Sequence, residues 1–158
     1  MNVDLKYVID NYSELVSKIA MFALKNNSDI DDVIQEVYLK VSDNLYKIND
    51  EEHLKNWLVV TTRNISYNYN KKFWRKRECE LFEKYYIANK SFIDEILSVK
   101  SKVKDLSDEY RETFDLYAQG YKYKEMSKKL KIREDAVRKR IERIREIIKV
   151  DIFEEGEW

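Results

Sequence analysis

The sequence contains no proline, only two glycines, a single cysteine and a single histidine among its 158 residues. With Gly only at positions 120 and 156, the chain has almost none of the residues that form tight β-hairpin turns. Lys, Glu, Leu and Ile are abundant instead, and these favour helices. We therefore expect an all-α fold. The length allows one ordinary domain or two small ones, and two small helical domains joined by a linker fit the pattern better.

The scarcity of Cys and His also limits the chemistry that this chain can support. Cys79 has no partner for an intramolecular disulfide, and His53 has no second His or Cys at metal-ligand spacing. Acidic residues are plentiful, but no pattern fixes a pair of them beside a nucleophile or a cofactor loop. We therefore expect no catalytic residues, no metal and no cofactor.

Long apolar runs are missing as well. No stretch approaches the roughly 20 apolar residues that a membrane-spanning helix needs, and no signal peptide is recognisable. We therefore expect no membrane insertion and a cytoplasmic location.

The net charge of zero conceals an uneven distribution. Residues 106–150 carry 13 basic against 9 acidic side chains, whereas the last eight residues carry four acids and no base. Residues 1–85 are almost balanced, with 13 basic and 14 acidic. The positive field therefore lies on the C-terminal half, and the neutral total does not exclude a nucleic-acid partner.

A strongly basic helix, preceded by a short one, dominates residues 123–149. Val137, Ile141, Ile144 and Ile148 recur at spacings of four, three and four, the period of one buried helix stripe. The other faces of this segment carry the cations Arg138, Lys139, Arg140, Arg143, Arg145 and Lys149. Such a helix can meet phosphates and base edges, so we interpret the segment as a helix-turn-helix. An ordinary solvated surface is the alternative interpretation.

The turn of this motif departs from the usual pattern. Lys131 stands where such turns commonly have Gly, so the backbone there must adopt a left-handed or similar conformation without the freedom of glycine. Ser127 is small where the two helices approach, and Ile132 is placed to anchor the turn by burying its side chain in the core. A preceding helix is expected to begin with Ser107 as its N-cap and to end at Gly120.

Two amphipathic segments open the chain. Residues 4–25 carry one apolar stripe that includes Ile9, and a second helix is expected after Ser28, which with Asp31 resembles a capping box. On this second helix several side chains lie off the apolar stripe, and these are Asp31, Asp32, Gln35, Glu36 and Tyr38. They are free to meet a partner, although acids in a first turn also simply complement the helix dipole.

A third helix is expected to open near Asp50, where Asn49 and Glu52 resemble a capping box. Further along it, cations and aromatics are interleaved among the residues Arg63, Asn64, Tyr67, Asn68, Lys71, Lys72, Trp74, Arg75, Lys76 and Arg77. Unstacked bases can stack on Tyr or Trp while cations follow the backbone, each stack contributing about 1–3 kcal/mol. This composition suits single-stranded DNA, whereas Trp57 and Phe73 can also be read as core residues.

The two halves are separated by a segment with weaker periodicity. We expect residues 1–85 to form the first domain, residues 86–105 a partly helical linker, and residues 106–150 the helix-turn-helix domain. The acidic residues 151–158 are expected to form a frayed tail.

Three stretches resemble the sigma-70 family of bacterial RNA polymerase sigma factors, in particular its compact extracytoplasmic-function type. The family's polymerase-docking helix resembles DIDDVIQEVYLKVSDNLYKI, residues 29–48. Its minus-ten-reading helix resembles NWLVVTTRNISYNYNKK, residues 56–72, with signature positions at Trp57, Leu58, Arg63 and Asn64. Its minus-35-binding helix-turn-helix domain is similar to residues 106–149 in order, spacing and length. The departures are Lys131 for the turn Gly, Ser127 for the usual Ala, and no Pro at the start of the last domain.

This resemblance implies a function that works by binding. A sigma factor docks on core RNA polymerase, recognises minus-35 and minus-ten promoter elements, and stabilises melted non-template DNA while the polymerase performs the catalysis. The alternative is a sigma-like helix-turn-helix regulator or adaptor that binds DNA without programming transcription itself. The family resemblance also implies an anti-sigma factor or another protein regulator as a further partner.

Three sets of candidate residues follow from the residue pattern and the resemblance. The set expected at the minus-35 element, with the basic helix in the major groove, is Tyr123, Lys124, Arg133, Glu134, Asp135, Ala136, Arg138, Lys139 and Arg143. The set expected at the minus-ten element, including a loop that receives a flipped base, is Asn49, Asp50, Glu51, Glu52, His53, Arg63, Asn64, Tyr67, Asn68, Lys71 and Lys72. The set expected to dock on polymerase is Asp31, Asp32, Gln35, Glu36 and Lys40.

Overall fold

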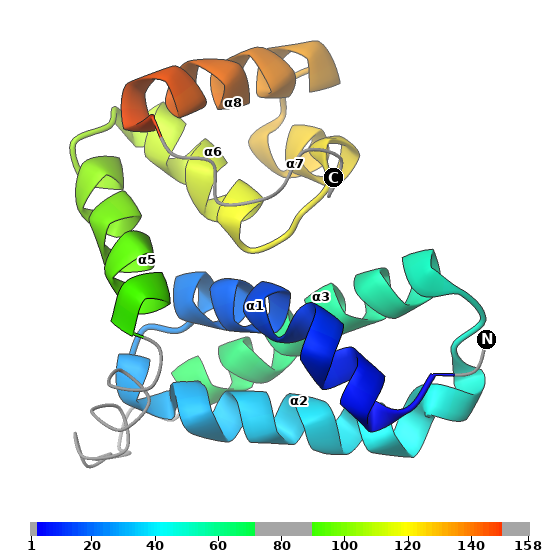
Figure 1. Cartoon of the computed structure of the whole chain (residues 1–158). Coiled ribbons are helices and arrows are strands. Elements are labelled where there is room, and N and C mark those ends of the chain that lie inside the picture. Colours follow the sequence, from blue (N-terminus) through cyan, green and yellow to red (C-terminus); the bar gives the residue numbers. More distant parts are fainter. Residues whose placement is uncertain (1–2, 72–89, 150–158) are drawn as a thin grey trace. The chain divides into compact units, whose positions relative to one another are not determined.

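A computed structural model describes residues 3–71 and 90–149, and within these ranges all regular secondary structure is helical (Figure 1). The chain divides into two compact units, residues 1–88 and 89–158. The expected all-α fold with two small helical domains is therefore confirmed. Lys72, the aromatic and basic residues that follow it to Arg77, and the acidic tail lie outside the described residues.

The first unit is a bundle of three helices. These are α1 (Leu5–Ala23), α2 (Ile30–Asn44) and α3 (Glu51–Asn70), and each of them packs against the other two (Figure 1). Two single 3-10 turns, Asn27–Asp29 and Leu45–Lys47, connect them. The short connections place α1 and α3 in contact, although they are separated in sequence by the whole of α2.

The core of this bundle follows the helical period. On α2 the buried residues are Ile30, Val33, Val37 and Val41, and on α3 they include Leu54, Leu58 and Ile65. Burying an aliphatic side chain of this size contributes about 1.5–3 kcal/mol, so these stripes hold the three helices together. One stripe residue was assigned wrongly, because Ile9 on α1 remains 38% exposed.

The helix starts in the first unit differ in detail from the expected capping boxes. The residue before α2 is Asp29, and the side chain that caps the preceding 3-10 turn is Asn26, which accepts from Ser28 N at 3.1 Å. The N-cap of α3 is Asp50, whose Oδ1 accepts from His53 N at 2.7 Å. Asp50 is the residue with extended backbone, which lets its side chain turn back onto the first helical turn.

The second unit contains α5 (Lys90–Val103), α6 (Asp108–Ala118), α7 (Tyr123–Leu130) and α8 (Glu134–Ile148). The last three pack against one another, and α5 contacts α8, where Lys102 Nζ donates to Ile148 O at 3.1 Å. Residues 90–103 therefore form a continuous helix that joins the second unit, where we had expected a partly helical linker over residues 86–105.

The core of the second unit is built on the predicted isoleucine stripe. Val137, Ile141, Ile144 and Ile148 are each at most 2% exposed, and Met126 of α7 is fully buried with them. The helix before the motif begins as expected, because Ser107 Oγ accepts from Tyr110 N. The chain leaves this helix through Gly120, whose φ of 83° suits a residue without a Cβ.

The turn between α7 and α8 has the left-handed conformation expected at Lys131. Its φ is 57° and its ψ is 42°, and Ile132 N donates to Ser127 O at 3.1 Å to close the end of α7. At the other end of α7, Glu125 Oε1 accepts from Lys122 N at 3.2 Å. Both ends of this eight-residue helix are thus closed, which fixes the direction in which α8 leaves the turn.

No helix in the described part of the chain is long and apolar enough to cross a bilayer. The longest one there, α3, has 20 residues, but it carries polar and charged side chains along its length.

Candidate nucleic-acid interface

The cations of α8 divide into two groups, and the first group faces α6. Arg140 Nη1 donates to Thr113 Oγ1 at 3.3 Å, and its Nη2 lies 3.8 Å from the Glu109 carboxylate. Arg145 Nη2 donates to the Tyr117 hydroxyl at 2.7 Å. Both arginines are half-buried. They therefore stabilise the packing of α8 on α6.

The second group is exposed. The Arg138 side chain is 53% exposed, with Nη1 3.7 Å from Asp135 Oδ1 and its guanidinium carbon 5.7 Å from the centre of the Tyr123 ring. Lys139 is exposed beside it. An exposed cation–π contact of this kind contributes about 0.5–1 kcal/mol, enough to orient the Arg138 guanidinium and too little to prevent it from meeting a phosphate.

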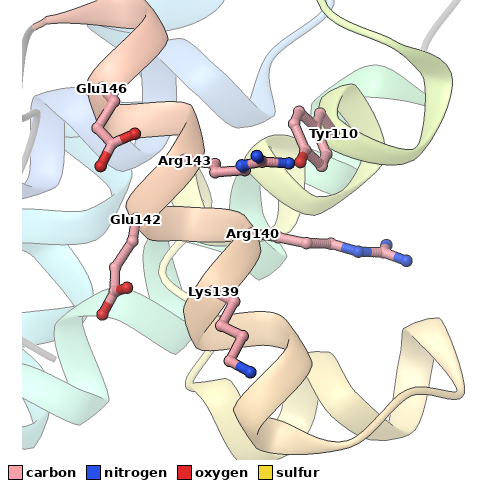
Figure 2. Close-up of a pocket in the computed structure, with 6 residues that line it drawn as sticks. All are labelled: Tyr110, Lys139, Arg140, Glu142, Arg143 and Glu146. Carbon is pink, nitrogen blue, oxygen red and sulfur yellow. The ribbon is translucent and has the colours of Figure 1, made fainter.

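A shallow pocket of about 360 Å³ lies between this helix and α6. Its lining residues, drawn in Figure 2, are Tyr110, Lys139, Arg140, Glu142, Arg143 and Glu146. In that view Arg143 extends toward Tyr110, while Glu142 and Glu146 project to the opposite side of α8. The hydrogen bond with the Tyr110 hydroxyl raises the pKa of Arg143. Because two carboxylates line the same pocket, its attraction for an anion is concentrated on the side of the arginines.

The remaining candidates for the minus-35 element gather around the first turn of α8. Arg133, Glu134 and Asp135 are exposed there, and Ala136 is half-buried. On α7, Lys124 is exposed and Tyr123 is half-buried under Arg138. The structure thus brings the predicted residues together, with Arg138 and Lys139 in the centre and Arg143 beside Tyr110.

On α3, an exposed face carries several of the candidates for the minus-ten element. Asn64, Asn68 and Lys71 are exposed at spacings of four and three, and Tyr67 beside them is half-buried; we call these four residues the melting face. Arg63 does not belong to it, because it is only 6% exposed. Arg63 was predicted to belong to the basic stretch that meets DNA, whereas position 63 falls on the side of α3 that meets the bundle.

The segment from Asn49 to His53, which we call the pocket loop, was expected to be a loop, but only Asn49 and Asp50 precede α3, and Glu51 to His53 form its first turn. The segment is held by its own polar groups. His53 Nδ1 accepts from Asn49 N at 3.2 Å, and His53 N donates to Asp50 Oδ1. The Glu52 side chain is exposed. Asp50 and His53 therefore shape the loop at its start.

Glu51, in the middle of this loop, interacts with α1. Its two carboxylate oxygens accept hydrogen bonds from the hydroxyls of Tyr7 and Tyr12. The hydrogen bonds from Tyr12 and then Tyr7 lower the pKa of Glu51. Burial and the hydrogen bond to Glu51 raise the pKa of Tyr12. No periodicity in the sequence indicated this cluster, since its members lie 39 and 44 residues apart.

The candidate docking residues all lie on α2, and we call them the docking face: Asp31, Asp32, Gln35, Glu36 and Lys40. Gln35 and Lys40 are exposed, and the three acids are half-buried. Leu39, four residues after Gln35, was not among the predicted docking residues, although its side chain is 67% exposed on the same helix. Its exposure could have been predicted from the sequence, because Leu39 is an apolar residue that lies off the buried stripe of the same helix.

Asn70, at the end of α3, is a second residue that the sequence analysis missed. Its Nδ2 donates to Ala23 O at 2.8 Å, and its Oδ1 accepts from Lys25 N at 2.8 Å. Both atoms of the side-chain amide thus bind backbone groups at the end of α1. This fixes the end of α3 next to Lys71, the last residue of the melting face.

Comparison with known proteins gives two family matches in the same order as the two units. Residues 8–77 match Sigma-70 region 2, and residues 97–148 match Sigma-70, region 4. The chain is also similar to a protein named RNA polymerase sigma factor SigZ from Bacillus subtilis (strain 168). The two sequences are 26% identical over 141 residues, which cover 85% of this chain and 78% of the Bacillus protein.

Proposed function

Because the chain belongs to the sigma-70 family of RNA polymerase sigma factors, of the extracytoplasmic-function type, we propose that it acts by binding alone, while the polymerase carries out every bond-forming step. It is a promoter-recognising sigma factor whose partners are core RNA polymerase and promoter DNA. The observation that carries this function is the presence of region 2 and region 4 in family order on one chain. A helix-turn-helix alone would support DNA binding and nothing more.

For the minus-35 element, α8 enters the major groove with its first turn toward the bases. The exposure of Arg138 and Lys139 supports this proposal, since both can reach phosphates or base edges. Arg143 reaches the DNA beside Tyr110, and Tyr123 with Lys124 approaches the DNA backbone from α7. Arg140 and Arg145 are left out of the contact, because they are bound to α6.

For the minus-ten element, the melting face and the pocket loop hold the opened non-template strand. The exposed amides of Asn64 and Asn68 can bond to base edges, while Lys71 attracts the backbone and Tyr67 offers a ring for stacking. The pocket loop receives one flipped base.

For polymerase docking, the docking face on α2 binds core polymerase through its mixture of acids, Gln35 and Lys40. Its residues lie outside the buried stripe of α2, so they can interact with a partner without disturbing the bundle. Charge complementarity across such a contact accelerates association and selects the partner.

Transcription in vitro with purified core polymerase tests this function. A library of promoter-length DNA is transcribed with and without the protein, and the selected templates are sequenced. We expect run-off transcripts only when the protein is present, from templates that share two elements at a fixed separation. Binding to DNA without assembly on core polymerase, measured by gel filtration, would instead support the sigma-like regulator.

A protein regulator of the anti-sigma kind fits the same surfaces. We propose that it would cover the docking face and thereby compete with core polymerase in the cytoplasm, where the polymerase works. The exposed Leu39 supports this proposal, because it adds apolar surface that a partner can bury beside the charged residues of the docking face. Displacement of the regulator by added core polymerase, followed on an immobilised protein, tests the competition.

A further inference from the structure

Two tyrosines of α1 bind the carboxylate of Glu51, the first residue of α3, and we call this cluster the clasp. Tyr7 donates its hydroxyl hydrogen to Glu51 Oε1, and Tyr12 donates to Glu51 Oε2. Each carboxylate oxygen thus receives one phenol. The two tyrosines lie five positions apart on α1, close enough for both rings to reach one carboxylate.

The clasp indicates that Glu51 works within the protein, although it was predicted to bind DNA. A carboxylate whose two oxygens each accept a hydrogen bond from a phenol of another helix is held in one orientation, and its charge repels phosphates. Glu51 is also in the first turn of α3, where a negative charge is favoured by the helix dipole. The lowered pKa of Glu51 agrees with a carboxylate that stays ionised inside this cluster.

We propose that Tyr7 and Tyr12 hold Glu51 as a positioning residue, which keeps the pocket loop in the shape that receives one unpaired promoter base. This inference rests on the proposed function of the pocket loop. The start of the loop is already fixed, because His53 Nδ1 accepts from Asn49 N. The clasp adds a connection to a different helix, so that the loop is held from two sides.

A loop held in this way loses less conformational entropy when it binds its base. Removing the clasp therefore weakens recognition of the melted strand more than binding to the closed duplex, which does not use the pocket. At a solvent-exposed site, hydrogen bonds to a charged group contribute only modestly to the free energy that fixes the segment. We therefore expect the loss of the clasp to reduce the preference for one base over the others by roughly three- to tenfold.

The test uses holoenzyme assembled from core polymerase and the Tyr7→Phe/Tyr12→Phe double variant. These changes remove both hydroxyls and keep both rings. Open-complex formation is measured on templates that carry each of the four bases, or an abasic site, at each non-template position of the minus-ten element. The matched control is Tyr46→Phe, the same change at a tyrosine that is 80% exposed and whose ring lies under the Lys47 ammonium.

We expect the wild type and Tyr46→Phe to prefer one base at one position. In the double variant this preference should be about three- to tenfold weaker, while the affinity for the closed duplex is unchanged. Glu51→Gln, which keeps one acceptor oxygen, should retain more of the preference than Glu51→Ala. This graded rescue separates a positioning role from a general loss of stability, which circular dichroism melts report independently.

The outcomes distinguish this inference from the proposed function. A wild type without base preference at any minus-ten position overturns the pocket itself, and the inference with it. A wild type that discriminates, with a double variant that discriminates equally, overturns only the positioning role. Should the double variant fail to fold, the single variants and Glu51→Gln are measured in the same way, and undiminished preference in all of them overturns the inference.

Discussion

Arg145 on α8 donates a hydrogen bond of 2.7 Å to the hydroxyl of Tyr117 on α6, and its guanidinium carbon lies 5.5 Å from the centre of the same ring. Tyr117 is only 2% exposed. The cation therefore serves the core of the DNA-binding unit. Counting the basic residues of α8 overestimates how many of them can reach a phosphate.

The first prediction separates packing cations from DNA-binding cations. Arg145→Ala should lower the free energy of unfolding by about 1–3 kcal/mol, because it removes packing and leaves the Tyr117 hydroxyl without its donor. Lys139→Ala should leave stability within about 0.5 kcal/mol but reduce the slope of log affinity against log salt by about one. Urea unfolding and DNA titrations at several salt concentrations measure the two effects.

Lys104→Ala is the control for this pair, since it removes an exposed cation of the same unit that does not belong to α8. The division of the α8 cations into packing and DNA-binding groups would be contradicted by either of two results. One is an unchanged salt slope for Lys139→Ala, and the other is a salt slope for Arg145→Ala that falls as much as that for Lys139→Ala.

The second prediction concerns the docking face. Asp32→Arg and Gln35→Ala should weaken holoenzyme assembly, since losing one partner of a desolvated charge pair costs about 2–5 kcal/mol. Leu39→Ala should reduce the binding free energy of the complex with core polymerase by more than about 1 kcal/mol, because we expect this side chain to be buried in the complex. Light scattering of mixtures with core polymerase measures assembly. Ile147→Ala, which shortens another apolar side chain that is 55% exposed, should have no effect. Equal assembly of all variants would place the docking surface elsewhere.

The third prediction concerns DNA melting. Asn68→Ala and Lys71→Ala should impair promoter opening more than closed-duplex binding, because these side chains meet the strand only after its bases have separated. Permanganate footprinting reports the opened thymines, and a gel shift at low temperature reports duplex binding. Lys6→Ala is the control for lost charge, as Lys6 is an exposed cation on α1 paired with Asp10. Parallel losses in both assays would argue against a melting face on α3.

The fourth prediction concerns the turn of the helix-turn-helix. Lys131→Gly should raise the free energy of unfolding by about 0.5–1 kcal/mol, because a left-handed backbone is strained for any residue with a Cβ. Lys128→Gly, the same change within α7, should lower it by about 1 kcal/mol. Thermal melts of both variants give the comparison, and destabilisation by both would show that the Lys131 side chain contributes more than its backbone strain costs.

The fifth prediction concerns the pH dependence of the clasp. The hydrogen bonds from Tyr12 and Tyr7 hold the pKa of Glu51 below its ordinary value of 4.5, so its stabilising contribution is complete above that pH. The contribution is lost as pH falls through the lowered pKa. The difference in unfolding free energy between wild type and Glu51→Ala should therefore be constant near neutral pH and shrink below about pH 4.5. Glu52→Ala, one residue away and exposed, is the control in the same urea titrations.

The helices and their buried stripes were largely predictable from the sequence. The spacing of Ile30, Val33, Val37 and Val41 is a local property of one helix, and it was sufficient to identify the face that packs. The same holds for the isoleucine stripe of α8 and for the left-handed turn at Lys131. These features depend on residues within a few turns of each other.

The parts that could not be predicted depend on partners far along the chain. Nothing near Arg63 in sequence shows that it faces the bundle, and nothing near Arg140 shows that Thr113 accepts its hydrogen bond from another helix. Glu51 was predicted to contact DNA because the whole segment from Asn49 to His53 was. The tyrosines that bind its carboxylate lie on α1, far away in sequence. The sequence pattern therefore placed Arg63 on the correct helix but on the wrong face.

The hydrogen bonds between α1 and α3 also determine when the first unit can complete its fold during synthesis. The partners of Tyr7 and of the Ala23 carbonyl are supplied 44 and 47 residues later, by the first and last residues of α3. A nascent chain that stops before α3 therefore exposes the apolar stripes of α1 and α2. The contacts between α1 and α3 can be completed only after Asn70 has been synthesised, so until then the chain exposes apolar surface of the kind that makes folding intermediates prone to aggregate.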